Sequence, residues 1–240
     1  MIAAASVVIP NFGGGGGGAG SCERANHLFC TSWVRGNWSS VLFPALRQHI
    51  VLTLIAVGIG FVIALTMAVA AHRRRWLERP LGVFTAVLYT IPSLALFGIL
   101  VPFFGLTRTN AEVALVGYTL VILFRNILTG LREVPAEVRE TAQGMGMTPR
   151  QSLLRVELPL ALPAIMAGLR IATVTVISLA TVAAYICDQG LGKPIFDAIN
   201  EGVFKTELIA AGGLAIMLAV AADILLVGAQ RLLTPWARVR

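Results

Sequence analysis

Five apolar segments decide what this chain can fold into. Each is close to or longer than the roughly 20 residues that cross a hydrocarbon core as a helix. They cover residues 50–71, 81–104, 113–131, 160–186 and 208–229. Backbone groups in lipid must be hydrogen-bonded within their own segment, which favours helices, and the alternating pattern of a membrane barrel is absent from the sequence. Only 13% of the residues are charged, against about 25% in a soluble domain, so the sequence predicts an all-α integral membrane protein with about five transmembrane helices.

The basic residues predict how these helices are oriented. An odd number of spans places the termini on opposite sides, and the cytoplasmic side is the one richer in arginine and lysine. Of the 19 basic residues, Arg125 and Arg170 lie inside spans, which leaves 17, and 11 of these share the side of the HRRRWLER loop against 6 on the other. We therefore expect an outside N-terminus and a cytoplasmic C-terminus. This distribution also explains the net charge of +7 without a nucleic-acid partner.

The same topology divides the chain into parts. Residues 1–49 are expected to be an extracytoplasmic tail, partly flexible because of the glycine run at 13–18. Residues 50–230 form the transmembrane domain, in which the loop 132–159 faces the cytoplasm, and residues 231–240 form a cytoplasmic tail.

No motif for catalysis, metal binding or nucleotide binding stands out. The pair Gly192-Lys193 is followed by Pro194 and lacks the spacing of a Walker A loop. The three histidines form no ligand cluster, and HExxH, GxSxG and CxxC are absent. Cys22 and Cys30 either form a disulfide, if the tail faces an oxidising compartment, or remain thiols. An obvious inverted repeat, as in many secondary transporters, is also missing.

The loop 132–159 is unusually polar for its place between apolar segments. Pro135 suits the first turn of a helix that runs through AEVRETAQ to about Gly144, where a glycine tolerates a left-handed cap. Thr148-Pro149-Arg150-Gln151 then forms a capping box that starts a second helix, which we expect to give way at Pro159. The composition alone allows this helix–turn–helix either to dock on another protein or to lie on lipid headgroups.

The spacing within this loop resembles the EAA loop of permease subunits of binding-protein-dependent ABC importers. That pattern is Glu-Ala-Ala, three residues, Gly, nine residues, a β-branched or similar residue, any residue, Leu-Pro. Its positions are filled here by Glu140, Ala142, Gly146, Val156, Leu158 and Pro159, with Thr141 in place of the first alanine. TIPSLALFGILVP at 90–102 and the segment 144–174 are similar to the osmoprotectant branch of the family, which takes up glycine betaine, choline, carnitine and proline betaine. The resemblance covers residues 41–230.

The resemblance implies a type I ABC importer permease fold in the inner or plasma membrane of a bacterium. A second permease, identical or related, would pair with this chain around a central path. A cytoplasmic ATPase dimer would bind ATP and magnesium, and an extracytoplasmic binding protein would deliver the solute. This chain is then expected to be no enzyme and to bind no cofactor or metal. The resemblance assigns coupling to the ATPase to Glu140, Ala142, Gly144, Gly146, Met147, Thr148, Pro149, Leu158 and Pro159. The alternatives are a permease for another small solute such as an amino acid, and a membrane-anchored interaction or regulatory protein.

Two further groups of residues are candidates for the path through the membrane. Arg170 and Asp223 are ionisable residues inside spans, which are costly in lipid and either pair with each other or face a water path. In the second span, Pro92 is predicted to kink or break the helix, with Ser93 and Thr90 free to bond the released backbone groups. Tyr89 and Phe97 are candidates to offer π faces to a quaternary ammonium, or are plain packing residues.

The outer loop between the fourth and fifth spans carries the remaining candidates. The family has a Gly-Ala-Gly-Gly-Leu-Gly-like segment there, at an external gate, and this chain has CDQGLG. Asp188 departs from it and Gly190 and Gly192 match it. The following KPIFDAINEGV is expected to be a short amphipathic helix, with Asp197 and Glu201 on one face. That face either contacts the binding protein or is simply solvated.

Overall fold

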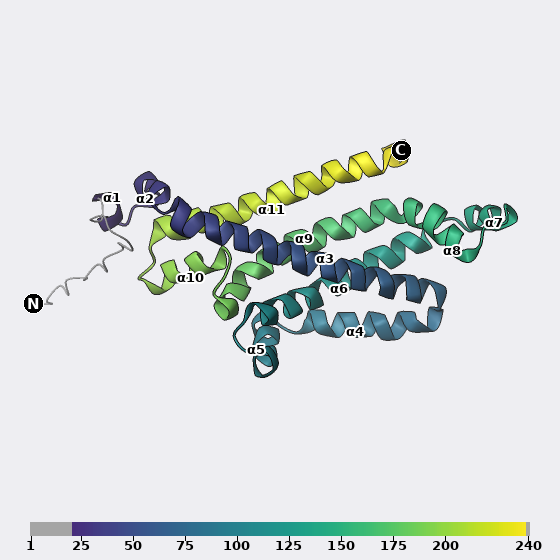
Figure 1. Cartoon of the computed structure of the whole chain (residues 1–240), viewed down its shortest axis with the longest axis horizontal. Coiled ribbons are helices and arrows are strands. Elements are labelled where there is room, and N and C mark those ends of the chain that lie inside the picture. The colour runs from purple at the N-terminus through teal and green to yellow at the C-terminus, as the bar shows by residue number, and fades with distance from the viewer. Residues whose placement is uncertain (1–20, 239–240) are drawn as a thin grey trace, which may run out of the picture.

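The computed structural model describes residues 21–238, and every regular element in that range is a helix. Four of these helices are long and apolar enough to cross a membrane (Figure 1). They are α3 (Phe43–Arg73), α6 (Arg108–Arg132), α9 (Leu158–Cys187) and α11 (Lys205–Leu233). The glycine run at 13–18 lies outside the described residues. Following the predicted orientation, we call the end of the bundle that carries α7 (Ala136–Gly144) and α8 (Pro149–Ser152) the cytoplasmic end, and the opposite end the outer end.

The second predicted span is broken in two, as its proline indicates. α4 (Glu78–Thr90) and α5 (Ser93–Phe104) meet at an angle of 100°. Pro92 lies outside both helices with extended backbone angles. Thr90 Oγ1 donates to the Val87 carbonyl at 2.8 Å, and the Tyr118 hydroxyl of α6 donates to the Ile91 carbonyl at the break. Counted together, α4 and α5 provide a fifth candidate span.

The proline that we expected to end the second loop helix lies within a longer helix. The prediction that the second loop helix stops at Pro159 is wrong, because one helical run continues from Pro149 to Cys187. A π turn, η3 (Leu153–Glu157), precedes Pro159 there, and η1 (Trp38–Leu42) precedes Pro44 in the same way. A proline ring clashes with the carbonyl four residues earlier, and in both cases that carbonyl belongs to the wider turn. α3 therefore begins at Phe43 rather than at residue 50.

α6 forms the centre of the bundle and packs mainly against α9 and α3. Near the outer end the core contains Leu52, Phe97, Leu115 and Val176, and near the cytoplasmic end it contains Leu123, Phe124, Ile127 and Ile165. Small residues bring the backbones close: a Cβ added at Gly130 would lie 2.7 Å from that of Ala164. This is the packing expected where helices associate in lipid through shape rather than hydrophobicity.

The segment before α3 is not a separate tail, because residues 21–42 pack on the outer end of the bundle. Cys22 and Cys30 form a disulfide between α1 (Ser21–Arg24) and the start of α2 (Thr31–Gly36). The Cys30 amide donates to Thr206 Oγ1 of α11 at 3.1 Å. Buried Trp33 packs edge-on against Phe204, with 5.3 Å between ring centroids. This apolar surface explains why the described part of residues 1–49 is ordered against α10 (Gly192–Asn200) and α11.

Candidate functional site: the cytoplasmic turn, the polar pair and the outer loop

α7 and α8 lie at the cytoplasmic end and are joined by the turn 145–148 (Figure 1). α7 ends in a Schellman motif: the Gly146 amide donates to the Gln143 carbonyl at 2.9 Å, and the Met147 amide to the Ala142 carbonyl at 3.1 Å. Gly146 has φ +81°, so it is this glycine that takes the left-handed conformation. The prediction that Gly144 would do so is wrong, because the motif places that residue in the last helical turn.

The start of α8 is the capping box that the sequence predicts. The Gln151 amide donates to Thr148 Oγ1 at 3.3 Å, and the Thr148 amide donates to Gln151 Oε1 at 2.8 Å. Pro149 occupies the first helical position, where its missing N–H costs nothing. The two caps together fix the shape of the turn with local hydrogen bonds alone.

The turn presents a mixed surface to solvent. Among the predicted coupling residues, Glu140, Gly144, Gly146, Thr148 and Pro149 are exposed, Met147, Leu158 and Pro159 are half-buried, and Ala142 is buried. Met145 is 65% exposed and Leu154 is 52% exposed. Apolar side chains of this size beside exposed polar residues can enter a groove on another protein.

A buried polar cluster that sequence reasoning missed ties this region to the first span. Glu157, in η3, has one carboxylate oxygen 2.7 Å from His72 Nε2 at the end of α3. Its other oxygen accepts from Ser152 Oγ of α8 at 3.1 Å. Because Glu157 is 7% exposed, its two contacts are buried, and together they link α8 and α9 to α3. No local pattern reveals the pair, since 85 residues separate His72 from Glu157.

Arg170 and Asp223 form an ion pair, which is one of the two arrangements expected for them. Arg170 Nε donates to Asp223 Oδ1 at 2.8 Å and Nη2 donates to Oδ2 at 3.1 Å. The two side chains join α9 to α11 and line a cavity of about 470 Å³ together with Val174 and Thr175. Pairing neutralises two charges that would each be costly in lipid.

The residues at the break between α4 and α5 lie elsewhere, against α6. The Tyr89 ring packs edge-on against Tyr118 with 5.9 Å between centroids, and it remains 47% exposed. Pro92 is exposed and Ser93 is half-buried. Phe97 is fully buried in the core, so its π face is not available to a solute. The two groups of predicted path residues therefore belong to different helix pairs.

The outer loop is held by α3. The Gly190 amide donates to Gln48 Oε1 at 3.1 Å, and the Leu191 amide donates to His49 Nδ1 at 3.2 Å. His49 Nδ1 is therefore an acceptor, which makes Nε2 the protonated nitrogen that donates to the Ile177 carbonyl at 3.1 Å. Gly190 has φ +78°, and a Cβ on Gly192 would overlap the Thr181 carbonyl oxygen. Both glycines are thus required by the local geometry.

Charged residues surround this loop. Asp188 ends α9 in the left-handed conformation, which aspartate tolerates better than most residues. Lys193 Nζ donates to Asp188 Oδ1 at 2.7 Å and lies 3.4 Å from Asp197 Oδ2. The pKa of Lys193 is raised above its ordinary value of 10.5, first by the hydrogen bond to Asp188. The ammonium group therefore stays charged at neutral pH. Asp197 and Glu201, on and just after α10, line an outer pocket.

Comparison with known proteins agrees with this arrangement. Residues 41–239 match the family described as "Binding-protein-dependent transport system inner membrane component". The chain is 37% identical to the choline transport system permease protein OpuBB of Bacillus subtilis (strain 168), over 78% of this chain and 86% of that protein. It is 35% identical to the glycine betaine/carnitine/choline transport system permease protein OpuCB of the same organism, over 85% of this chain and 93% of that protein.

Among solved structures, an inward-facing conformation of the MetNI methionine ABC transporter has a similar fold. The TM-score is 0.75 at 22% identity, and the alignment covers 82% of this chain and 98% of that one. With a family match over most of its length, several membrane-crossing helices and this fold, the chain belongs to the binding-protein-dependent transport system inner membrane component family and is a multi-pass ABC importer permease.

Proposed function

We propose that the chain forms one half of the path through which an ATP-driven importer takes up an osmoprotectant of the quaternary-ammonium class, such as choline, glycine betaine, carnitine or proline betaine. The names of the two Bacillus subtilis relatives support this solute class, because those proteins align with most of this chain. The observation that carries the coupling mechanism is the exposed turn 145–148, which is continuous with a 39-residue helix that runs to the outer loop.

The ATPase acts on this chain through the turn 145–148. ATP and magnesium bind to a partner ATPase rather than to this chain, and that partner receives the turn in a groove. Met145 supplies the apolar contact, and Glu140 and Arg150 flank it with charge. A flexible, polarisable methionine adapts to such a groove as it changes shape. We prefer this reading to a loop lying on headgroups because the spacing from Glu140 to Pro159 matches the coupling loop of the family to which the chain belongs.

The movement passes along α9. The helical run Pro149–Cys187 ends at the Asp188–Gly192 loop. A displacement of its cytoplasmic end therefore also displaces the outer loop. The Glu157 contacts to His72 and Ser152 keep α8, α9 and the end of α3 in register. ATP binding in the partner would bias this assembly between two states, which is what alternating access requires.

The other partners follow from the same scheme. A second permease, of the same or a related chain, completes the path, and an extracytoplasmic binding protein delivers the solute to the outer loop, where Asp188, Asp197 and Glu201 are available. The complex resides in the inner or plasma membrane of a bacterium. The Arg170–Asp223 pair holds α9 against α11 and gives the cavity beside it a polar wall.

Uptake into proteoliposomes tests this proposal. The permease is reconstituted with its ATPase and binding protein, and labelled choline, glycine betaine, carnitine, methionine and histidine are compared. We expect uptake of the first three solutes only, dependent on enclosed ATP. Uptake of the amino acids instead would refute the solute class. Uptake without the ATPase, driven by an ion gradient, would refute the mechanism.

A further inference from the structure

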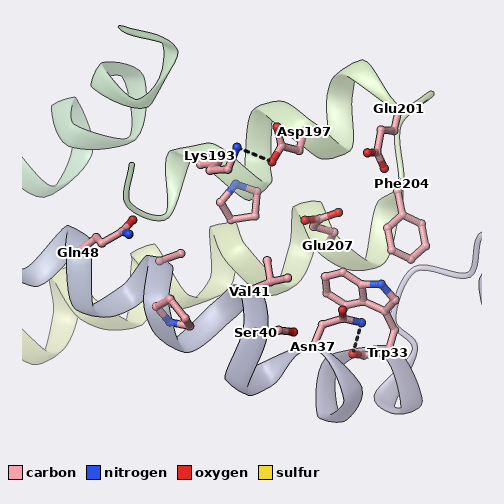
Figure 2. A pocket seen from close by; sticks show the side chains of 13 residues that line it. Trp33, Asn37, Ser40, Val41, Gln48, Lys193, Asp197, Glu201, Phe204 and Glu207 are labelled. Atoms are coloured by element: carbon pink, nitrogen blue, oxygen red, sulfur yellow. Dashed lines mark hydrogen bonds and ion pairs between the residues drawn. The ribbon is translucent and has the colours of Figure 1, made fainter. Parts of the chain in front are cut away.

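A pocket of about 320 Å³ opens at the outer end between the N-terminal segment and α10–α11. Its walls come from α2, η1, the start of α3, α10 and the start of α11 (Figure 2). It is separate from the turn 145–148 and from the Arg170–Asp223 pair, and part of its wall precedes residue 41, where the family match begins. The polar and aromatic residues that line it are Trp33, Asn37, Ser40, Gln48, Lys193, Asp197, Glu201, Phe204 and Glu207.

The pocket carries an excess of negative charge. Asp197, Glu201 and Glu207 all line it, and Lys193 is its only lining cation among the described residues. That cation is already engaged, because its ammonium group lies 2.7 Å from Asp188 Oδ1 and 3.4 Å from Asp197 Oδ2. Neither the Glu201 nor the Glu207 carboxylate forms an ion pair within residues 21–238.

Glu207 is the decisive residue. It is 8% exposed, and within residues 21–238 its carboxylate makes no hydrogen bond or ion pair. Figure 2 shows it directed into the space beside Trp33, Phe204 and Glu201. Burial of an unpaired carboxylate is costly, so a buried acid aimed into an open pocket indicates that a cation completes the site.

The walls favour an organic cation over a metal ion. Within the described residues no three His, Cys, Asp or Glu side chains come together closely enough to hold a metal. The acids instead share the pocket wall with the Trp33 indole, which is 7% exposed, and with the side chains of Phe204, Val41 and Pro44. An aromatic face beside a carboxylate is the chemistry that recognises quaternary ammonium groups.

The position of Trp33 is fixed by its surroundings. The Asn37 side chain donates to the Trp33 carbonyl at 3.0 Å. The disulfide at Cys30 and the bond from the Cys30 amide to Thr206 anchor the start of the same helix on α11. A ring held in this way loses little freedom when a ligand packs against it.

We propose that this pocket is a binding site for a small quaternary-ammonium cation at the outer end of the permease, with Glu207 as its counter-ion and Trp33 as its aromatic wall. This inference rests on the proposed function and specifies its solute. The site favours choline, which carries only a positive charge, over glycine betaine, whose carboxylate would meet Glu201 and Glu207. Lys193 does not relieve that repulsion, since Asp188 and Asp197 already hold it.

Equilibrium dialysis with labelled choline tests the site in the full-length permease, held in lipid nanodiscs without ATPase or binding protein. We expect saturable binding that glycine betaine and the neutral carbon analogue of choline, dimethylbutanol, compete for only weakly. Glu207→Gln should weaken binding by about tenfold or more, and Trp33→Leu by about fivefold. Glu207→Asp, which keeps the negative charge, should retain most of the choline affinity of the wild type. Glu133→Gln, an exposed acid at the cytoplasmic end, serves as the matched control and should change nothing.

Thermal stability in the same nanodiscs checks that the variants fold. Because Glu207 is buried without a partner, Glu207→Gln should melt at or above the temperature of the wild type when choline is absent, and a given choline concentration should stabilise the wild type more than Glu207→Gln. Absence of saturable choline binding, or equal competition by dimethylbutanol, would overturn the proposal. Choline binding without ATP-driven uptake would refute the proposed function alone, and uptake without this binding would refute the site alone.

Discussion

Replacement of Gly146 is the sharpest perturbation of the cytoplasmic turn. Its φ of +81° lies in the left-handed region, and a Cβ there would meet no atom within 4 Å. The cost of Gly146→Ala is therefore a backbone cost, about 1–2 kcal/mol for a left-handed non-glycine residue. That cost reduces the population of the observed turn by about 5- to 30-fold relative to other conformations.

Gly146→Pro should be more severe. Proline fixes φ near about −65° and has no N–H, so it excludes the left-handed conformation and also removes the bond from the Gly146 amide to the Gln143 carbonyl. That bond contributes about 1 kcal/mol. The turn does not contribute to the packing of the transmembrane helices. Both variants should therefore accumulate in the membrane at the level of the wild type.

Gly144 offers a matched comparison two residues away. It has ordinary helical geometry, and a Cβ there also meets no atom within 4 Å. Alanine at this helical position stabilises by about 0.5–1 kcal/mol. ATP-driven uptake, normalised to permease abundance, should therefore fall several-fold in Gly146→Ala, vanish in Gly146→Pro and fall far less in Gly144→Ala. Wild-type uptake by Gly146→Pro, or equal losses in the two alanine variants, would refute the reasoning.

Three other predictions concern separate parts of the chain. Loss of either charge in the Arg170–Asp223 pair should lower the melting temperature and the uptake, and swapping the two residues should recover part of both. Additive losses in the swap would contradict the pairing. Thr148→Ala removes the capping box at a cost of about 1 kcal/mol and should reduce uptake at constant abundance, whereas Thr148→Ser should not. Reduction of the Cys22–Cys30 disulfide should destabilise the folded N-terminal segment by about 2–3 kcal/mol. Trypsin should therefore cut this segment faster under reducing conditions. Equal rates would show that the disulfide does not hold the segment in place.

The features that the sequence predicted are those determined locally. The long apolar runs predicted α6 and α11 because a segment that must satisfy its backbone in lipid has little choice but to be helical. Pro92 predicted the break between α4 and α5. The TPRQ pattern predicted the start of α8, since both of its cap bonds join residues only three apart.

The features that were missed depend on distant partners or on choices that local rules leave open. Both Gly144 and Gly146 can take a left-handed cap, and only the Schellman hydrogen bonds decide between them. Pro159 ends a helix in most contexts, but a π turn allowed the chain to continue. The contacts of Glu157 with His72, and of Trp33 with Phe204, form between residues far apart in sequence, so no spacing rule reveals them.

In the proposed mechanism, the turn 145–148 is the surface on which the ATPase acts. Photo-crosslinking tests it directly, with benzoylphenylalanine placed at Met145 in the assembled transporter. Leu232 is the control, because it is more exposed than Met145, at 79% against 65%, and lies at the cytoplasmic end of α11. We expect a crosslink to the ATPase subunit from position 145 that changes in yield on addition of ATP, and none from position 232. Equal yields from the two positions, or no ATPase adduct at 145, would contradict it.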